Sequence, residues 1–390
     1  MPSETPPSPS YDLVIAGGGL AGGLVALALA TLRPDLKIAL IEAEAHFGGN
    51  HIWSFFDSDV AAEHRWLLDP LISRRWNDYD VHFPKYSRTL SNGYNSIESQ
   101  NLDRELRKRL PAEALKNGHK AILVESGSVQ LADGSKIAAQ AVLDVRGGGD
   151  ISALENGWQK FCGQMLRLKE PHGLDRPIIM DATVEQIDGY RFVYCLPFSD
   201  TDIFVEDTYY ADTSALDSVT SHARIAEYAA VRGWTIDKVL SEEKGQLPVI
   251  YGGDFEAFWN GNPGVDARAG ARAALIQPIT SYSLPMAVRT AMLIAEMPEI
   301  TQGKLDKMLR DLARGHWKNS KFYRLLCAFL FLGADPEKRY RTLQHSYAKD
   351  ERLLARFYAG KSTRLDQLSL LSGKPPIPIS RAIPLLLKYR

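Results

Sequence analysis

Cysteine is scarce in this chain of 390 residues, and the three that occur exclude two kinds of site. Cys162, Cys195 and Cys327 lie far apart and are odd in number, so they predict neither a disulfide framework nor a CxxC metal pair. We therefore expect a reducing compartment. No metal site is expected from histidine either, because the closest pair, His46 and His51, has no cysteine or acidic residue at ligand spacing.

Long apolar runs are almost absent as well. The one uncharged stretch that is long enough to suggest a transmembrane helix, residues 13–30, carries five glycines near its start. A strand, a glycine turn and a helix explain this stretch better, so an integral membrane protein is not expected. Residues 1–10 lack the basic segment of a signal peptide, and their Pro/Ser-rich composition predicts a disordered tail.

The net charge of -1 conceals an asymmetry along the chain. Residues 301–390 contain 19 Lys and Arg against 7 Asp and Glu, which leaves 27 against 40 for residues 1–300. Such a basic region suits nucleic acid, an anionic membrane surface or the solvated face of helices packed on an acidic body. No nucleic-acid recognition motif accompanies the charge, so the last two alternatives are favoured. Apolar residues at helical spacing from residue 322 onward predict helices here.

A glycine-rich motif follows the first predicted strand, residues 11–16. Residues 17–22 have the sequence GGGLAG, in which Gly17 permits a tight turn, Gly19 admits a pyrophosphate and Gly22 lets a helix pack closely. The N–H groups at the start of that helix, from Leu20, face the anion. Glu42 ends the next strand, where an acidic residue accepts hydrogen bonds from a ribose. The combination predicts a dinucleotide site.

Two later segments favour FAD over NAD as this dinucleotide. A second glycine-rich segment, residues 47–51, follows soon after Glu42, and it contains Gly49, Asn50 and His51. A β-turn pattern at residues 131–135 then leads into a strand that ends near Gly147. Many FAD enzymes return to the nucleotide domain through such a hairpin.

A candidate catalytic acid lies on a predicted hairpin formed by residues 190–196 and 201–210. The two-residue period of a strand puts Glu206 on one face and Asp207 on the other, each among aromatic or aliphatic neighbours. Desolvation raises the pKa of a carboxyl, so such a group can be protonated near neutral pH and act as a general acid. The alternative is a charged residue on a solvent-facing strand.

Five motifs together resemble the bacterial lycopene β-cyclase family. In chain order they are residues 48–55 (GGNHIWSF), 144–147 (DVRG), 204–210 (FVEDTYY), 278–285 (PITSYSLP) and 322–326 (FYRLL). The resemblance spans about residues 11–382. It implies a peripheral enzyme on the cytoplasmic side of the bacterial membrane, which closes β-ionone rings on lycopene to give γ-carotene and then β-carotene. It also implies reduced FAD as cofactor, NAD(P)H as electron source and no net redox change.

The resemblance also assigns roles to individual residues. It maps the essential acid or base to Glu206, with Asp207 as the second choice, and it places Pro278 and Thr280 on the flavin side. The chain departs from the family pattern at Ala273, Ala274 and Gln277, where relatives tend to carry glycines and a histidine. It also departs at Ser281, where glycine is usual, and at Cys327, where asparagine is common. Two other functions stay open: an FAD-dependent monooxygenase or reductase acting on an isoprenoid, and a non-catalytic carotenoid or flavin carrier.

The expected fold is α/β. A Rossmann-type FAD-binding domain of the extended-FAD class is expected from residues 11–50, 101–150 and 264–297. Residues 51–100 and 151–263 are expected to form an inserted β-sheet substrate domain and its connections. Residues 298–390 are expected to form a helical, basic C-terminal region that suits a membrane surface.

Overall fold

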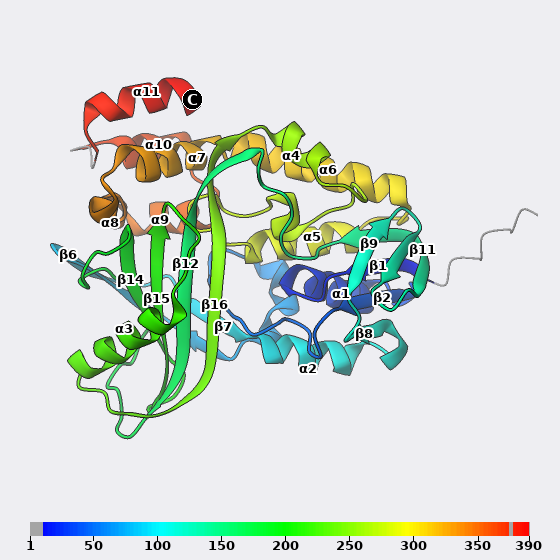
Figure 1. Ribbon diagram of the computed structural model, residues 1–390, viewed down its shortest axis with the longest axis horizontal. Coiled ribbons are helices and arrows are strands. Elements are labelled where there is room, and N and C mark those ends of the chain that lie inside the picture. The colour runs from blue at the N-terminus through cyan, green and yellow to red at the C-terminus, as the bar shows by residue number, and fades with distance from the viewer. Residues whose placement is uncertain (1–10, 374–376, 390) are drawn as a thin grey trace, which may run out of the picture.

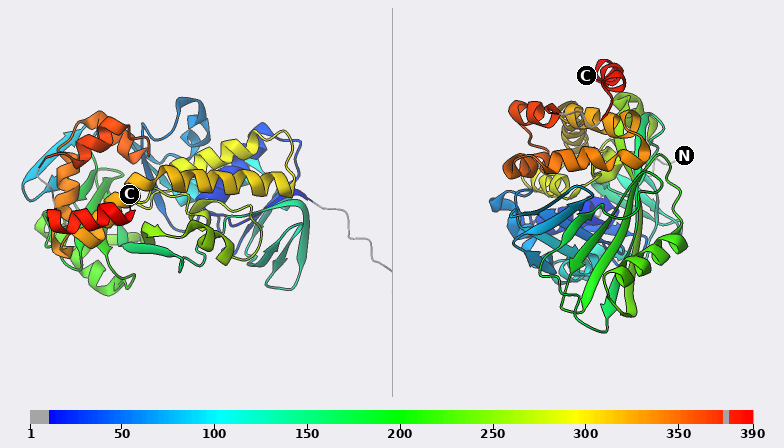
Figure 2. Two further views of the ribbon diagram at one scale, coloured as in Figure 1. Left: turned by 90° about the horizontal axis from the view of Figure 1, so that it is seen from above. Right: turned by 90° about the vertical axis from the view of Figure 1, so that its left-hand side faces the viewer.

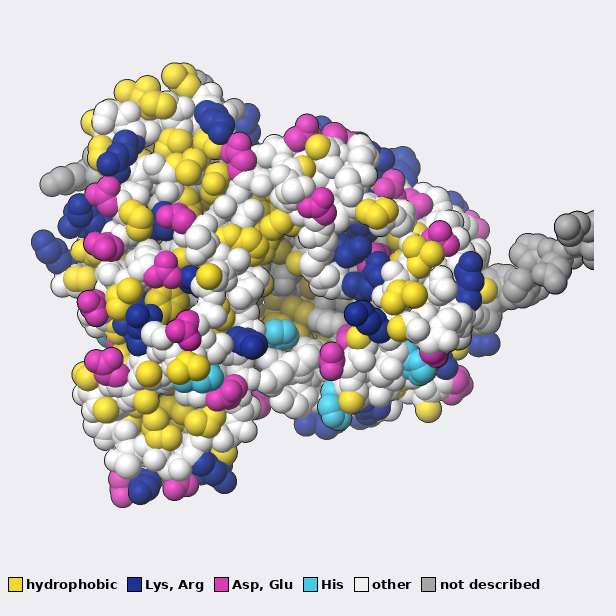
Figure 3. All heavy atoms as spheres, in the orientation of Figure 1, with side chains coloured by type: hydrophobic (Ala, Val, Ile, Leu, Met, Phe, Trp, Pro, Cys, Tyr) yellow, Lys and Arg dark blue, Asp and Glu magenta, His cyan; other side chains and the backbone are white. Residues whose placement is uncertain are grey.

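The fold has a nucleotide-type half and a half built on a larger sheet (Figure 1). The computed structural model describes residues 11–373 and 377–389, so the tail predicted for residues 1–10 lies outside the described residues. Figure 3 shows a hollow between the two halves, with hydrophobic side chains on its floor and Lys and Arg side chains along one rim.

The nucleotide-type half contains a six-stranded sheet in the order β8-β2-β1-β11-β10-β9. Strands β1 (Tyr11–Ala16), β2 (Ile38–Glu42), β8 (Leu115–Asn117) and β11 (Lys136–Asp144) are parallel, whereas β9 (Ala121–Glu125) and β10 (Ser128–Leu131) pair antiparallel. Helix α1 (Leu20–Leu32) packs against α5 (Leu284–Ala295) and α2 (Ser99–Arg109). The predicted strand, glycine turn and helix are therefore confirmed.

The larger sheet has seven strands in the order β16-β12-β15-β14-β13-β5-β6. Their bounds are β5 (Tyr79–Phe83), β6 (Tyr86–Leu90), β12 (Leu154–Leu168), β13 (Ile178–Asp181), β14 (Tyr190–Pro197), β15 (Asp202–Ala211) and β16 (Ile236–Gly253). The predicted hairpin is confirmed as β14 and β15, which pair antiparallel. Helix α3 (Ser218–Val231) packs on β12 and β15 and covers one face of the sheet. A third, small sheet joins β3 (Ile52–Phe56), β7 (Tyr94–Glu98) and β4 (Arg74–Trp76).

Helices dominate the rest of the chain. After α4 (Phe255–Gly261) and α5 come α6 (Gln302–Asn319), α7 (Lys321–Ala328), α8 (Tyr340–Tyr347), α9 (Glu351–Tyr358), α10 (Arg364–Leu371) and α11 (Ile379–Tyr389). Figure 2 shows α8 to α11 gathered at the end of the molecule that carries the larger sheet, while α6 runs over the nucleotide-type half. Among the described residues, no helix has both the length and the apolar character needed to cross a bilayer. The predicted α/β class and the helical C-terminal region are confirmed.

A buried arginine ties the C-terminal helices to the larger sheet. The side chain of Arg339 is 1% exposed, and its guanidinium donates to the carbonyls of Leu330, Phe331 and Tyr210, each at 3.1 Å. It also pairs with Asp212 at 2.6 Å. Since Tyr210 is the last residue but one of β15, this one group connects the strand of the candidate acid to the helical layer.

Replacing Arg339 with alanine should destabilise the protein. Arg339→Ala removes the donor that these three buried carbonyls share, so the free energy of unfolding should fall by about 3 kcal/mol in denaturant titrations. Arg341→Ala is the matched control, because Arg341 is exposed, and it should change the free energy by less than about 0.5 kcal/mol. Equal midpoints for both variants would contradict this role of Arg339.

Candidate active site

A cleft of about 600 Å³ lies where β1, β2 and β11 end and α1 begins. It brings together most of the residues predicted to bind a cofactor. Those that line it are Gly17, Gly19, Leu20, Glu42, Gly49, His51 and Gly147. Arg146 and Arg272 also line the cleft, and both pair with the buried carboxylate of Asp144, at 2.8 and 2.7 Å.

Two of the glycines are required by the turn itself. Gly17 has a φ of +117°, and a Cβ there would lie 2.7 Å from the carbonyl oxygen of Val145. A Cβ on Gly22 would lie only 1.9 Å from the carbonyl oxygen of Gly17. A side chain at either position would therefore break the contact between the turn, the helix and β11.

Gly19 differs from Gly17 and Gly22, because the missing side chain leaves open space for a ligand and not room for a neighbouring part of the protein. It is the N-cap of α1, its φ is -72°, and no side chain caps the helix. A Cβ there would meet no described atom within 4 Å. The free N–H groups of the first turn, together with this opening, fit a pyrophosphate.

Glu42 lies at the rim of the cleft in a fixed position. Its Oε2 accepts a hydrogen bond from the N–H of Gly18 at 2.9 Å, and its Oε1 accepts one from the N–H of Glu44 at 3.0 Å. Both oxygens keep further acceptor capacity, which suits ribose hydroxyls. The open glycine turn, the uncapped helix and this carboxylate together fit a dinucleotide such as FAD.

The remaining predicted cofactor residues lie elsewhere. The amide of Asn50 donates to the carbonyl of Glu242, and Pro278 is buried and lines neither this cleft nor the neighbouring cavity in the described chain. Thr280 lines the neighbouring cavity, where its buried Oγ1 has no hydrogen-bond partner. Two of the departures from the family pattern, Ala274 and Ser281, have φ values of +51° and +54°. This left-handed backbone explains why glycine suits both positions.

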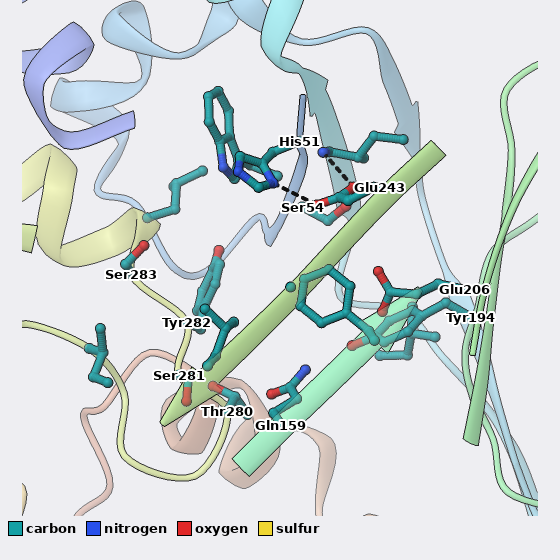
Figure 4. A pocket seen from close by; sticks show the side chains of 18 of the residues that line it. His51, Ser54, Gln159, Tyr194, Glu206, Glu243, Thr280, Ser281, Tyr282 and Ser283 are labelled. Atoms are coloured by element: carbon teal, nitrogen blue, oxygen red, sulfur yellow. Dashed lines mark hydrogen bonds and ion pairs between the residues drawn. The ribbon is translucent and has the colours of Figure 1, made fainter. Parts of the chain in front are cut away.

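An aromatic cavity of about 320 Å³ adjoins the cleft (Figure 4). Its aromatic lining comprises Trp53, Phe56, Tyr94, Phe161, Phe192, Tyr194, Phe204, Tyr210, Tyr282 and Tyr358. His51, Trp53 and Ser283 line both the cavity and the cleft, so the two spaces meet at these side chains. An apolar ligand in the cavity would therefore lie next to a cofactor in the cleft.

Glu206 is a carboxyl in the wall of this cavity. It lies on β15 with Phe204 and Tyr210, which also line the cavity, as the period of the strand predicts. Burial and, after it, the nearby charge of Glu243 raise the pKa of Glu206 to about 8, although a hydrogen bond from Thr208 Oγ1 at 2.5 Å lowers it. At neutral pH this group therefore carries a proton that it can donate.

Asp207 lies on the opposite face of β15, outside the cavity. Its Oδ1 accepts from Arg191 Nε at 2.7 Å, and the hydroxyl of Tyr209 donates to its other oxygen. Burial raises the pKa of Asp207, while the charge of Arg191 lowers it. The structure therefore does not bring the two predicted catalytic carboxylates together, and the contacts of Asp207 are those of an ion pair within the protein.

Two acidic residues near the cavity were missed by reasoning from the sequence. Glu243 on β16 lines the cavity and contacts His51 Nδ1 at 3.0 Å. Asp59 is buried beside the cavity, and its Oδ2 accepts from the hydroxyl of Tyr282 at 3.0 Å. Burial raises the pKa of Asp59 to about 7. Neither residue lies in a motif, since Glu243 follows another glutamate in a polar stretch and Asp59 lies in a loop.

Substituting Gly19 should separate ligand binding from folding. In Gly19→Val the side chain enters only the open cleft, so the thermal unfolding of the protein without FAD should not change, while FAD affinity should fall at least tenfold. Fluorescence titration with FAD measures the affinity. Gly303→Val is the matched control, because Gly303 also has open space but lies on α6. Equal FAD affinity in both variants would remove Gly19 from the site.

Solved structures share this fold at low sequence identity. A geranylgeranyl bacteriochlorophyll reductase-like protein from Thermoplasma acidophilum superimposes with a TM-score of 0.62 at 12% identity, covering 97% of this chain and 99% of its own. The flavin-dependent brominase Bmp2 superimposes with a TM-score of 0.58 at 13% identity, covering 97% and 98%. The fold is thus one that flavin-dependent enzymes use.

Sequence relatives cover nearly the whole chain. A lycopene beta-cyclase of Pantoea ananas is 44% identical over 96% of this chain and 97% of its own length. One of Pseudescherichia vulneris is 42% identical over 95% and 96%. The family model described as lycopene cyclase protein matches residues 12–383. The chain therefore belongs to the lycopene cyclase family.

Proposed function

We propose that this protein is a lycopene β-cyclase, an enzyme that closes the ends of lycopene into β-ionone rings without net redox change. The observation that carries the proposal is Glu206, a carboxyl protonated at neutral pH in an aromatic cavity beside a dinucleotide cleft. The relatives named lycopene beta-cyclase, which match over nearly their full length, support the same activity.

The reaction follows from what these side chains can do. Glu206 donates its proton to the terminal double bond of lycopene, which leaves a tertiary carbocation. The next double bond attacks this cation and closes a six-membered ring, and loss of a ring proton to a base then forms the ring double bond. Aromatic side chains such as Tyr94, Tyr194 and Phe204 present their electron-rich faces to the positive charge. The apolar lining keeps out water, which would otherwise trap the cation as an alcohol.

The cleft supplies a cofactor to this chemistry. We propose that Gly17, Gly19, Gly49, Gly147 and Glu42 hold FAD, with NAD(P)H as the source of the electrons that keep it reduced. When bound, the reduced flavin supplies negative charge next to the cation. His51, Trp53 and Ser283, which line both spaces, separate the cofactor from the substrate and orient each toward the other.

The competing proposal is a monooxygenase or reductase acting on an isoprenoid. Aromatic hydroxylases usually carry a Gly-Asp pair before the late helix, and residues 273–278 contain none. One experiment distinguishes the two activities: anaerobic incubation of the protein with lycopene in liposomes, FAD and NADPH, followed by chromatography of the pigments. A cyclase gives ring-containing isomers of lycopene. Unchanged lycopene beside reduced flavin would instead favour an oxygenase or reductase.

The C-terminal helices support a peripheral position on the cytoplasmic side of a membrane. On α11, Ile379, Ile383 and Leu387 recur every four residues and are 62%, 52% and 78% exposed. Leu365 and Leu368 on α10 are 77% and 66% exposed. Figure 3 shows hydrophobic side chains gathered where α11 lies. Because lycopene is a hydrocarbon of the bilayer, we propose that α10 and α11 rest on the membrane surface.

Removing the proton of Glu206 should stop cyclisation. Glu206→Gln has the shape of the native side chain but cannot donate the proton, so β-ring formation should fall at least a thousandfold while FAD binding is retained. In the native enzyme the rate should decline as the pH rises above about 8, since deprotonation removes the acid. Undiminished turnover by the glutamine variant would remove Glu206 from the mechanism.

The surface of α10 and α11 should bind anionic lipid. The purified protein should co-sediment with phosphatidylglycerol vesicles at low salt and release as salt is added. The double variant Ile383→Glu/Leu387→Glu should bind at least tenfold more weakly. Val231→Glu, on α3 and 83% exposed in the native chain, is the matched control and should bind normally. If both variants sediment alike, these helices are not the contact surface.

A further inference from the structure

Glu206 and Glu243 form a pair across the larger sheet. The register aligns Gly163 of β12 with Glu206 on one side and with Glu243 on the other. Residues aligned across neighbouring strands point to the same face, and two strand spacings separate the backbones of the two acids by about 10 Å. Both side chains line the aromatic cavity, so they extend into the same space from either side of a glycine (Figure 4).

Contacts on Glu243 fix the position of its carboxyl group. Its Oε2 accepts from the N–H of Ile52 at 3.0 Å, and its Oε1 contacts His51 Nδ1 at 3.0 Å. The side chain of Glu243 is 8% exposed, whereas that of His51 is 44% exposed. Both oxygens of Glu243 therefore have a partner, which fixes this side chain at the wall between the cavity and the cofactor cleft.

The other polar groups around Glu206 do not supply such a charge. Tyr94 and Tyr194, on β7 and β14, lie nearby as neutral phenols, because burial raises the pKa of both. Thr208 donates to Glu206, and Asp207 on the far face is paired with Arg191. Among the described residues that line the cavity, Glu243 is therefore the acidic side chain whose charge acts on Glu206.

Resting on the proposed function, we propose that Glu243 is a positioning residue, whose carboxylate keeps Glu206 protonated between turnovers. The charge of Glu243, on the same face of the sheet, makes ionisation of Glu206 unfavourable, so the acid regains its proton from solvent after each ring closure. His51 holds this charge in place at the boundary between the cavity and the cofactor cleft. Glu206 therefore reacts with the substrate, and Glu243 determines whether Glu206 is protonated.

The test is the titration of Glu206 in the protein without lycopene. Infrared spectra of protein labelled with ¹³C-glutamate, compared with Glu206→Gln, identify the carboxyl band of Glu206. Glu243→Gln keeps the size of the side chain and one acceptor oxygen for the N–H of Ile52 but removes the charge, so the midpoint of that band should move about one pH unit lower. The alkaline limb of the rate of cyclisation should move with it.

Controls keep the outcome decisive. Glu242→Gln is the matched control. The side chain of Glu242 is 54% exposed, lies on the other face of β16 and accepts a hydrogen bond from Gln164. Removing its charge should leave the midpoint of the Glu206 band unchanged. Equal midpoints in the native protein and Glu243→Gln would overturn the proposal. Failure of the native protein to cyclise lycopene would instead overturn the proposed function, since the titration needs no substrate.

Discussion

Keeping a carboxyl protonated inside an apolar cavity is the constraint on which the rest of this structure depends. A glutamate side chain in water is ionised at neutral pH and has no proton to give to an unactivated double bond. Glu206 keeps its proton because the sheet and the aromatic side chains around it desolvate the carboxyl group. The sheet serves this purpose directly. Pairing of β15 with β12 on one side and β14 on the other fixes which face Glu206 occupies, and a one-residue shift would exchange it with Asp207.

The two faces of the larger sheet differ in what they contact. On the face covered by α3, Asp207 is neutralised by Arg191, and the aliphatic side chains of β15 complete a small core. On the other face the aromatic side chains leave a cavity, which meets the cofactor cleft at His51 and Trp53. The helices after α5 close this face, and Arg339 connects them to the end of β15. The acid, the cofactor cleft and the C-terminal helices are thereby held as one unit.

Local signals in the sequence were enough for the parts of the site that depend on neighbouring residues. The glycine turn from Gly17 to Gly22, the position of Glu42 and the placement of Glu206 and Asp207 on opposite faces of a strand each follow from spacing within one or two elements. The choice of Glu206 as the acid came from the family resemblance, and the structure places it in the cavity wall. Glu243 could not be found in this way. Its place opposite Glu206 depends on how β16 aligns with β12, a pairing between segments about 80 residues apart that local periodicity does not encode. Asn50 and Pro278 failed to reach the cleft for a similar reason, since their side-chain directions are set by contacts with distant segments.

The central claim is that a proton from a protein carboxyl, and not an electron or an oxygen atom, is what enters the product. A single turnover without oxygen, after the flavin-reduced protein has equilibrated in D₂O, tests this most directly by mass spectrometry of the pigment. The account predicts one deuterium in each new ring and no other change in mass, because Glu206 exchanges its proton with solvent before it meets lycopene. Rings without deuterium, or products that have gained oxygen or two hydrogens, would contradict it.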